Sequence, residues 1–184
     1  IILSLPYDRA GTTMQRWSMD EGCAAEYHDP ASRRFHAQPV ACPTCGPHYQ
    51  LCHGDSVVTG DSEVVAAAVE LLRAGRILAV KGLGGYHLAC DAQQAGAVRA
   101  LRERKFRKEK PFALMVRDLA IARRLCRLSP QAEALLTSNA RPIVLAEAAV
   151  DLPGVAPDNG DLGLMLPYTP LHHLLFAAGA PQVL

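Results

Sequence analysis

The chain lacks any run of about 18 apolar residues, the length that a helix needs to cross a bilayer. It also lacks the basic start and apolar core of a secretory signal peptide. Nineteen Lys and Arg nearly balance eighteen Asp and Glu, so the net charge is only +1. These absences predict a chain that does not enter a membrane and whose basic surface is local. Because it starts at Ile1 rather than at methionine, we expect it to be part of a longer protein.

The six cysteines lack the layout of a disulfide framework. Cys90 and Cys126 lie in apolar, regular segments, and Cys23, Cys42 and Cys45 gather around one motif. Unpaired thiols are typical of a reducing compartment, so we expect a cytoplasmic protein.

The N-terminal third differs in composition from the remainder. Residues 1–54 are rich in proline, histidine, arginine and cysteine and show no sustained hydrophobic period, so burial alone is not expected to fold them. The rest alternates strand-like and helix-like patterns without an internal repeat. We therefore predict an α/β fold over residues 55–184, a mixed twisted sheet with helices, preceded by a small metal-knuckle segment over residues 1–54.

Helix and strand signals divide the second region further. Helices are expected to start at Asp61 or Ser62, near Gln94, after Asp118, at Ser129-Pro130 and at Thr169-Pro170. Strands are expected over residues 76–81, 112–116, 141–145, 162–166 and 182–184.

The most specific motif is Asp20-x-x-Cys23, followed after eighteen residues by Cys42-x-x-Cys45. The spacing matches a two-knuckle zinc site in everything except the first ligand, where cysteine would be usual. Zinc accepts thiolates and also a carboxylate oxygen, so Asp20 is predicted as the fourth ligand. Two alternatives stay open: a chance Cys23 without metal, or a fourth ligand drawn from His28, His36 and His48.

A glycine-rich turn, Lys81-Gly-Leu-Gly-Gly-Tyr-His87, follows the first expected strand. Glycines let backbone N–H groups approach an anion, and Lys81 adds positive charge at the strand end. The turn has neither the Walker nor the GxGxxG pattern, so a plain strand-to-helix turn is the alternative.

Residues 99–110 carry a dense run of positive charge. A run on a helix is usually a solvated face, but here Lys105, Arg107 and Lys110 leave the helix end just before an apolar strand. Cations at such a rim can hold phosphates or, alternatively, nucleic acid.

Several other polar residues lie at strand and helix ends, and each alone is typical of a structural role. Thr169 reads as a helix cap, and His172 or His173 as partly buried core residues. Ser138, Arg141 and Tyr168 complete the set. No Ser-His-Asp order or paired-carboxylate pattern accompanies them.

Longer motifs run through the whole chain and carry a family resemblance. They are Leu5-Pro-Tyr-Asp-Arg9, Glu26-Tyr27, Arg33-Arg-Phe-His-Ala-Gln-Pro39, Ala41-Cys-Pro-Thr-Cys-Gly-Pro47, Gly84-Gly-Tyr-His-Leu-Ala-Cys-Asp-Ala92, Lys110-Pro-Phe-Ala-Leu-Met115, Arg141-Pro-Ile-Val-Leu145 and Gly163-Leu-Met-Leu-Pro-Tyr-Thr-Pro-Leu-His-His-Leu-Leu175. Together they resemble the HypF-type carbamoyltransferases of NiFe-hydrogenase maturation.

The resemblance implies a function and a domain plan. Residues 1–54 would be the end of a paired zinc-finger region and residues 55–184 most of a YrdC-like domain, lying between an acylphosphatase domain and a transferase domain in the family's full chain. In that family carbamate released from carbamoyl phosphate reacts with ATP, supplied with Mg²⁺, to form carbamoyl adenylate. The carbamoyl group then passes to the C-terminal cysteine of HypE. This chain would hold the adenylation step only and is not expected to act alone.

The resemblance also assigns residues to the nucleotide and substrate pocket. Residues 81–92 align with the P-T-x-T-x-Y-G-L turn of YrdC proteins, and Lys105-x-Arg107 aligns with their K-x-R motif. The expected pocket residues are Lys81, Tyr86, His87, Lys105, Arg107, Lys110, Ser138 and Arg141. Asp20 departs from the family's cysteine, and the family's T-S-G-N segment of the nucleotide site lies past Leu184. The alternative function is a YrdC-type module that binds double-stranded RNA or tRNA.

Overall fold

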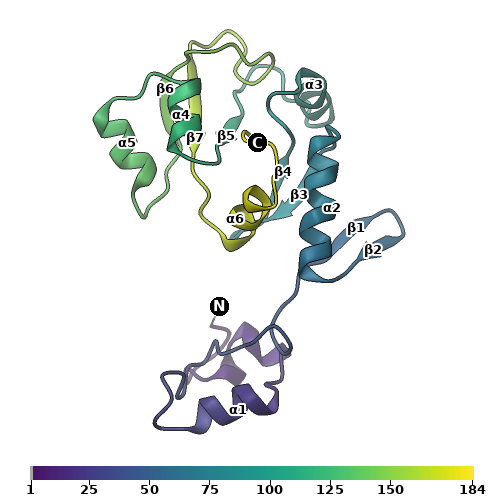
Figure 1. Ribbon diagram of the computed structural model, residues 1–184, viewed down its shortest axis with the longest axis vertical. Helices are drawn as coiled ribbons and strands as arrows, with labels where there is room; N and C mark the ends of the chain where they lie inside the picture. The colour runs from purple at the N-terminus through teal and green to yellow at the C-terminus, as the bar shows by residue number, and fades with distance from the viewer. Residues whose placement is uncertain (1) are drawn as a thin grey trace. The chain divides into compact units, whose positions relative to one another are not determined.

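A computed structural model describes residues 2–184 and divides the chain into two compact units, the first ending at Asp61 and the second spanning Ser62–Leu184 (Figure 1). The expected domain boundary after residue 54 stays a prediction. Among the described residues no helix has the length and apolar character needed to cross a bilayer.

The first unit is built from short elements. These are the 3₁₀ helices η1 (Arg9–Gly11) and η2 (Thr13–Arg16), the helix α1 (Glu21–His28) and the antiparallel strands β1 (Leu51–His53) and β2 (Ser56–Val58). Its apolar core holds three buried residues, Cys23, Tyr27 and Val40. The sequence did not predict α1, because only Cys23 and Tyr27 of this helix are buried and they are too few to form a hydrophobic period.

A buried arginine stabilises the loops of the first unit. Arg9 is only 8% exposed, and its Nη1 donates to the carbonyl oxygens of Gln38 at 2.8 Å and Val40 at 2.7 Å. Its Nη2 donates to the Trp17 carbonyl at 2.8 Å. A guanidinium that satisfies buried carbonyls replaces part of the stabilisation that a larger apolar core would supply.

The second unit alternates helices and strands. Its helices are α2 (Asp61–Arg73), which begins at the last residue of the first unit, α3 (Ala95–Arg104), α4 (Leu119–Leu125), α5 (Pro130–Thr137) and α6 (Pro170–Ala177). Its strands are β3 (Leu78–Lys81), β4 (Tyr86–Ala89), β5 (Ala113–Met115), β6 (Val144–Glu147) and β7 (Asp161–Met165).

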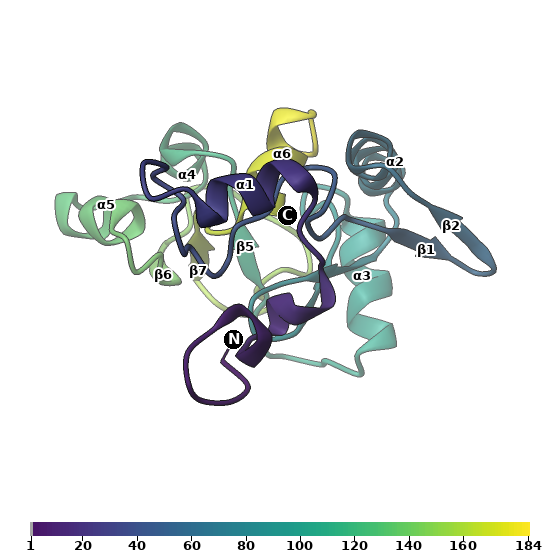
Figure 2. The same ribbon diagram turned by 90° about the horizontal axis from the view of Figure 1, so that it is seen from below.

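These strands form two small sheets. β3 and β4 make an antiparallel pair in which Lys81 lies opposite Tyr86. β7 lies between β5, to which it is parallel, and β6, to which it is antiparallel. Figures 1 and 2 agree in placing α4 and α5 beside β6 and β7, with α2 and α3 on the other side of the unit, and Figure 1 shows the β3–β4 pair on that side as well. The predicted mixed α/β fold is confirmed.

Local signals predicted the helix starts after residue 60 correctly. The side chain of Asp118 accepts from the Ile121 N–H at 2.9 Å, and that of Ser129 accepts from the Ala132 N–H at 3.2 Å. Thr169 accepts from the His172 N–H at 3.3 Å. Each cap satisfies a donor that the first turn of a helix leaves unpaired.

Two expectations about strands need correction. The strand expected over residues 141–145 begins only at Val144, because Arg141 has φ +45°, a left-handed conformation that does not fit a strand. The glycine-rich turn connects two strands rather than a strand and a helix, closing with a bond from the Gly82 N–H to the Gly85 carbonyl at 2.7 Å. No helix N-terminus therefore follows this turn.

Residues 182–184 lie along the end of β5. The Leu184 N–H donates to the Met115 carbonyl at 2.9 Å, and the Met115 N–H donates to the Leu184 carbonyl at 2.8 Å. The expected strand is thus present as a short bridge between Val116 and Val183.

Candidate functional site

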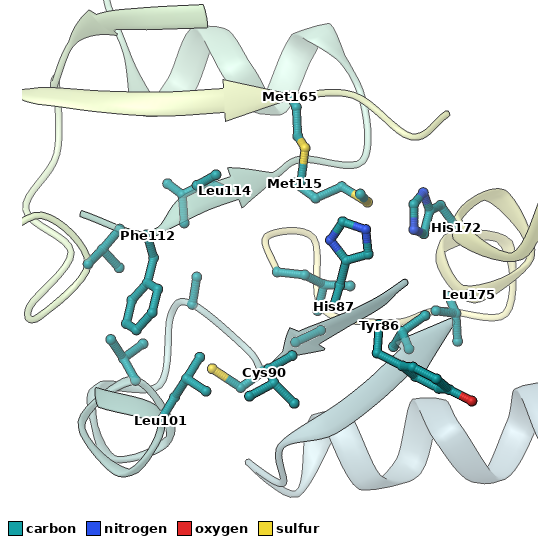
Figure 3. Close-up of a pocket in the computed structure, with 18 of the residues that line it drawn as sticks. Tyr86, His87, Cys90, Leu101, Phe112, Leu114, Met115, Met165, His172 and Leu175 are labelled. Atoms are coloured by element: carbon teal, nitrogen blue, oxygen red, sulfur yellow. The ribbon is translucent and has the colours of Figure 1, made fainter. Parts of the chain in front are cut away.

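The second unit contains a pocket of about 290 Å³ between the β3–β4 pair, β5 and the helices α3 and α6 (Figure 3). One end is lined by His87, His172, Met115 and Met165, and the other by Cys90, Leu101, Phe112 and Leu114. This volume lies near the lower end of the ~300–1,000 Å³ typical of small-molecule sites.

Three of the predicted site residues line this pocket: Tyr86, His87 and Lys105. The Nζ of Lys81 lies 5.0 Å from the centroid of the Tyr86 ring, but this ring is exposed and points away from His87 (Figure 3). Arg107 stacks on another lining residue, since its guanidinium carbon is 5.2 Å from the centroid of Phe112. Residues from both predicted motifs therefore approach one cavity.

Ser138 and Arg141 lie elsewhere. The Ser138 hydroxyl donates to the Leu135 carbonyl at 2.7 Å, and Arg141 Nη1 donates to the Leu136 carbonyl at 3.2 Å. Both residues follow α5 and are not among the residues lining the pocket. Their assignment to the site stays a prediction without support from this geometry.

Arg102 organises the basic segment, a role that sequence reasoning missed when it placed the arginines of this helix on the solvent side. Its guanidinium donates to the carbonyl of Arg107 at 2.9 Å, to those of Lys108 and Lys110 at 3.2 Å, and to the carbonyls of Gly154 and Val155. Desolvation, and then the charge of Arg107, lower the pKa of Arg102. The side chain therefore joins the loop after α3 to the loop before β7.

The cations of this segment divide into two groups. Arg107 donates through Nε to the Lys110 carbonyl at 2.9 Å and through Nη2 to the Pro111 carbonyl at 2.7 Å. In contrast, Lys81, Lys105 and Lys110 make no side-chain hydrogen bond or ion pair with any of residues 2–184. The lysines are thus the groups free to bind an anion. With two arginines committed to carbonyls, the segment is less suited to nucleic acid than its sequence indicates.

Two histidines and a tyrosine form an aromatic cluster at one end of the pocket. The Tyr168 hydroxyl lies 3.1 Å from His87 Nε2, and the ring centroids of Tyr168 and His172 are 4.7 Å apart. His172 is 4% exposed. Burial, then the nearby His87 and His173, lower the pKa of His172 to about 4, so its imidazole is neutral at pH 7. The sequence pointed to a buried histidine here but not to its place in the pocket.

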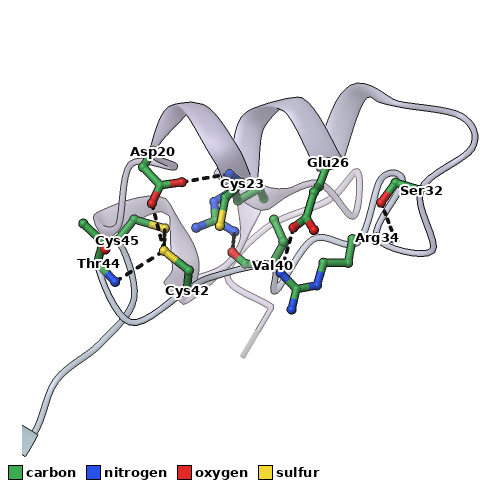
Figure 4. Close-up of polar contacts among 10 residues, drawn as sticks. Asp20, Cys23, Glu26, Ser32, Arg34, Val40, Cys42, Thr44 and Cys45 are labelled. Atoms are coloured by element: carbon green, nitrogen blue, oxygen red, sulfur yellow. Dashed lines mark hydrogen bonds and ion pairs between the residues drawn. The ribbon is translucent and has the colours of Figure 1, made fainter.

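The first unit contains a separate cluster of potential metal ligands. One donor atom each from Asp20, Cys23, Cys42 and Cys45 lies within 4.8 Å of the others (Figure 4). His28 and His36 instead pack against the Tyr27 ring, and His48 lies 3.4 Å from the Asp61 carboxylate. Among the residues that the structure describes, Asp20 rather than a histidine completes the set. That the four bind zinc stays a prediction.

The donor spacing fits a tetrahedral ion. Two thiolates bound at about 2.3 Å to one zinc lie about 3.8 Å apart, and the Sγ atoms of Cys42 and Cys45 are 3.8 Å apart. Asp20 Oδ2 lies 2.8 Å from Cys42 Sγ, whereas a carboxylate and a thiolate that share zinc would be about 3.5 Å apart. Metal binding thus requires only a small outward shift of the carboxylate.

Asp20 has a second partner that accounts for an aspartate at this position. Its Oδ1 accepts from the Cys23 N–H at 2.8 Å and so caps α1. The hydrogen bonds from Cys42 and from the Cys23 backbone lower the pKa of Asp20. Burial raises the pKa of Cys23 to about 12, so in the metal-free state this thiol stays protonated. Metal binding would have to displace that proton.

Comparisons with known families match both units. The model for Sua5, YciO and YrdC proteins, described as "Telomere recombination", matches residues 70–184. The model described as "HypF finger" matches residues 21–52, which begins just after Asp20.

Individual relatives extend the likeness over the whole chain. The chain is 54% identical to carbamoyltransferase HypF of Rhodobacter capsulatus, with all of this chain but 26% of that protein covered. It is 50% identical to HypF2 of Cupriavidus necator over 87% of this chain and 27% of the relative. The chain thus spans about a quarter of the length of these relatives.

Solved structures agree with these matches. Full-length HypF in a phosphate- and nucleotide-bound form is 44% identical, with a TM-score of 0.83 over all of this chain and 24% of that one. YciO of Escherichia coli, at 22% identity and a TM-score of 0.55 over 66% of this chain and 62% of that one, shares the fold.

Proposed function

The chain belongs to the Sua5/YciO/YrdC family, in the form that HypF carbamoyltransferases carry behind a HypF finger, and we propose that it activates carbamate with ATP during hydrogenase maturation. The proposed product is carbamoyl adenylate. In the longer protein the carbamoyl group would then pass to the C-terminal cysteine of HypE.

The proposed step is attack on a phosphorus atom. A carbamate oxygen forms a bond to the α-phosphorus of ATP held with Mg²⁺, the bond from that phosphorus to the bridging oxygen breaks, and pyrophosphate leaves with the electron pair. Negative charge moves onto the leaving group, so the site needs fixed cations more than a base.

One observation carries the proposal: Lys105, which has no side-chain hydrogen bond or ion pair with any of residues 2–184, lies with Tyr86 and His87 in the wall of a single pocket. Lys81 lies against the exposed Tyr86 ring, on the face of the β3–β4 pair opposite His87. Arg107 approaches the pocket wall at Phe112. Lys110, whose carbonyl accepts from Arg102 and Arg107, belongs to the same loop. The similar full-length HypF was solved in a phosphate- and nucleotide-bound form, and the proposal extends nucleotide and phosphate binding to this chain.

The apolar end of the pocket suits the lability of the product. Leu101, Phe112 and Leu114 line it, and they offer no hydrogen-bonding group to a water molecule. Such a wall would help to keep water out of the pocket, where water would otherwise hydrolyse the mixed anhydride.

Zinc in the first unit would have a structural role. Bound by Asp20, Cys23, Cys42 and Cys45, it would join the start of α1 to the turn at residues 42–45. We assign it no part in the adenylation step.

Pyrophosphate release tests the proposed function in the longer natural protein that contains this chain. Release should require both ATP and carbamoyl phosphate, and Lys105→Ala should lower it by about a hundredfold, because one fixed cation is lost where charge develops. Lys108→Ala is the matched control, since Lys108 is exposed and does not line the pocket. An unchanged rate in Lys105→Ala would reject the role of this lysine.

The salt dependence of binding distinguishes the alternative function, RNA binding, from ATP binding. Binding to nucleic-acid phosphates weakens along a linear log–log slope with salt. ATP binding would instead saturate with one nucleotide per chain. A steep salt slope without pyrophosphate release would favour the nucleic-acid module.

A further inference from the structure

The histidine end of the pocket contains an unsatisfied polar atom. His172 Nδ1 is buried, and nothing within residues 2–184 makes a hydrogen bond to it. Buried polar groups in folded proteins nearly always have a partner, so an unpaired nitrogen in a pocket wall points to a ligand. The residue itself is 4% exposed.

Two imidazoles face the same space. His87 enters it from β4 and His172 from α6, with ring centroids 6.4 Å apart and planes at 88°. Figure 3 shows both rings next to Met115, with Leu175 below His172 in this view. A small group that lies alongside both rings can therefore contact each of them.

The His87 ring is held in a fixed orientation. Its Nε2 lies 3.1 Å from the Tyr168 hydroxyl. A Cβ atom added at Gly82 would come within 2.6 Å of His87 Cδ2 and Nε2, so only glycine leaves room for this edge of the ring. The Tyr168 contact thus holds one nitrogen of His87 and leaves the other for a ligand.

The two rings offer complementary hydrogen-bonding groups. A neutral imidazole has one N–H donor and one acceptor nitrogen, and burial keeps His172 neutral at pH 7. A primary amide needs both kinds of partner, because its carbonyl accepts and its NH₂ group donates. This pairing fits a small planar amide better than an ion.

The side chains around the two histidines restrict the size of the group that can bind there. Met115, Met165 and Leu175 add apolar surface at this end, and the whole cavity measures about 290 Å³. An alkyl group on the amide nitrogen would remove an N–H donor and would also have to fit among these side chains.

We propose that His87 and His172 form the acyl subsite of the pocket and that they select an unsubstituted carbamoyl group over N-alkylated carbamoyl groups. The proposal rests on the function proposed above and adds the residues that determine which acyl group is accepted. His172 contacts the carbamoyl group directly, and Tyr168 and Gly82 position His87.

Stable mimics of the adenylate test the subsite in the longer natural protein. The probes are the sulfamoyl adenosine that carries a carbamoyl group and its N,N-dimethylcarbamoyl analogue, with both affinities measured by calorimetry. The unmodified protein should bind the carbamoyl mimic at least about tenfold more tightly, because the dimethyl analogue lacks the N–H donors.

Three variants separate recognition from structure. His172→Phe keeps a ring of similar size without nitrogen and should reduce the preference to within about twofold, through weaker binding of the carbamoyl mimic alone. His172→Asn, whose amide lies where Nδ1 lies, should restore part of the preference. His173→Phe alters the exposed neighbour and should leave the preference unchanged.

The outcomes distinguish the subsite from the reaction. Pyrophosphate release without any preference between the mimics would overturn the subsite and leave the adenylation step in place. A preference for the carbamoyl mimic without pyrophosphate release would overturn the adenylation step and leave the subsite in place. If His172→Phe lowers the affinity for both mimics equally, this histidine is only structural and the subsite is overturned. If the unmodified protein binds neither mimic, the subsite is also overturned.

Discussion

The two units of the chain are stabilised by different means. Among its described residues, the first has three buried apolar residues, a buried arginine and a cluster of four potential metal ligands. The second has two apolar clusters, one centred on β5, β7, α3 and α4 and the other on α2 and α6. Short segments without a hydrophobic period cannot bury enough apolar surface, so specific polar contacts and a metal are expected to take over that role.

The largest expected effect concerns the metal ligands. Cys42→Ser should reduce bound zinc from about one per chain and unfold the first unit, because metal binding supplies about 10–16 kcal/mol in small zinc domains. Elemental analysis would give the zinc content, and limited proteolysis would show whether the second unit stays folded.

Cys52→Ser is the control for this change, because Cys52 is exposed and lies outside the ligand cluster. Absence of zinc from freshly purified protein would remove the metal site, and the first unit would then be stabilised by its polar contacts alone.

Truncating a buried apolar side chain of the second unit should destabilise that unit and leave the first unit unchanged. Leu164 on β7 is fully buried, so Leu164→Ala should destabilise the second unit by about 2–5 kcal/mol. Denaturant unfolding measures this loss, while zinc content should not change. Leu145→Ala on the neighbouring strand is the control, since Leu145 is 71% exposed. A loss of zinc in Leu164→Ala would show that the units depend on each other.

A smaller effect is expected from pH on the second unit. His172 has a pKa of about 4 in the folded chain against 6.5 in the unfolded one, so between these values the unfolded chain binds more protons. Stability from this group is present above pH 6.5 and is lost as pH falls toward 4, by at most about 3 kcal/mol.

The matched measurement compares unfolding of the unmodified chain and His172→Asn across pH 4–7. The difference in unfolding free energy should change between pH 4 and 6.5 and be flat from there to pH 7. A constant difference would show that the histidine is not buried in its neutral form.

Predictability from the sequence differed between local and distant features. The caps at Asp118, Ser129 and Thr169 were predicted because each joins residues three positions apart. The strand over residues 141–145 was misplaced, because the left-handed backbone of Arg141 leaves no mark in a pattern of apolar residues.

The candidate site was predicted only in part, for a similar reason. Lys105, Tyr86 and His87 stood in recognisable motifs and do line one pocket. Arg102 stood in a charge run whose ordinary meaning is a solvated face, and its carbonyl partners at Gly154 and Val155 lie more than fifty positions away. Side-chain function over such a separation depends on packing that no short segment encodes.

The sequence by itself determined the α/β class, the helix starts after residue 60 and the spacing of the candidate ligands Cys42 and Cys45, because these follow from short-range periodicity, capping and turns. Only the tertiary structure decided that His87 and His172 meet, and that Asp20 is both a helix cap and a candidate ligand. The physical reason is that each of these depends on where separate segments pack, and that is settled by the burial of the whole unit rather than by neighbouring residues.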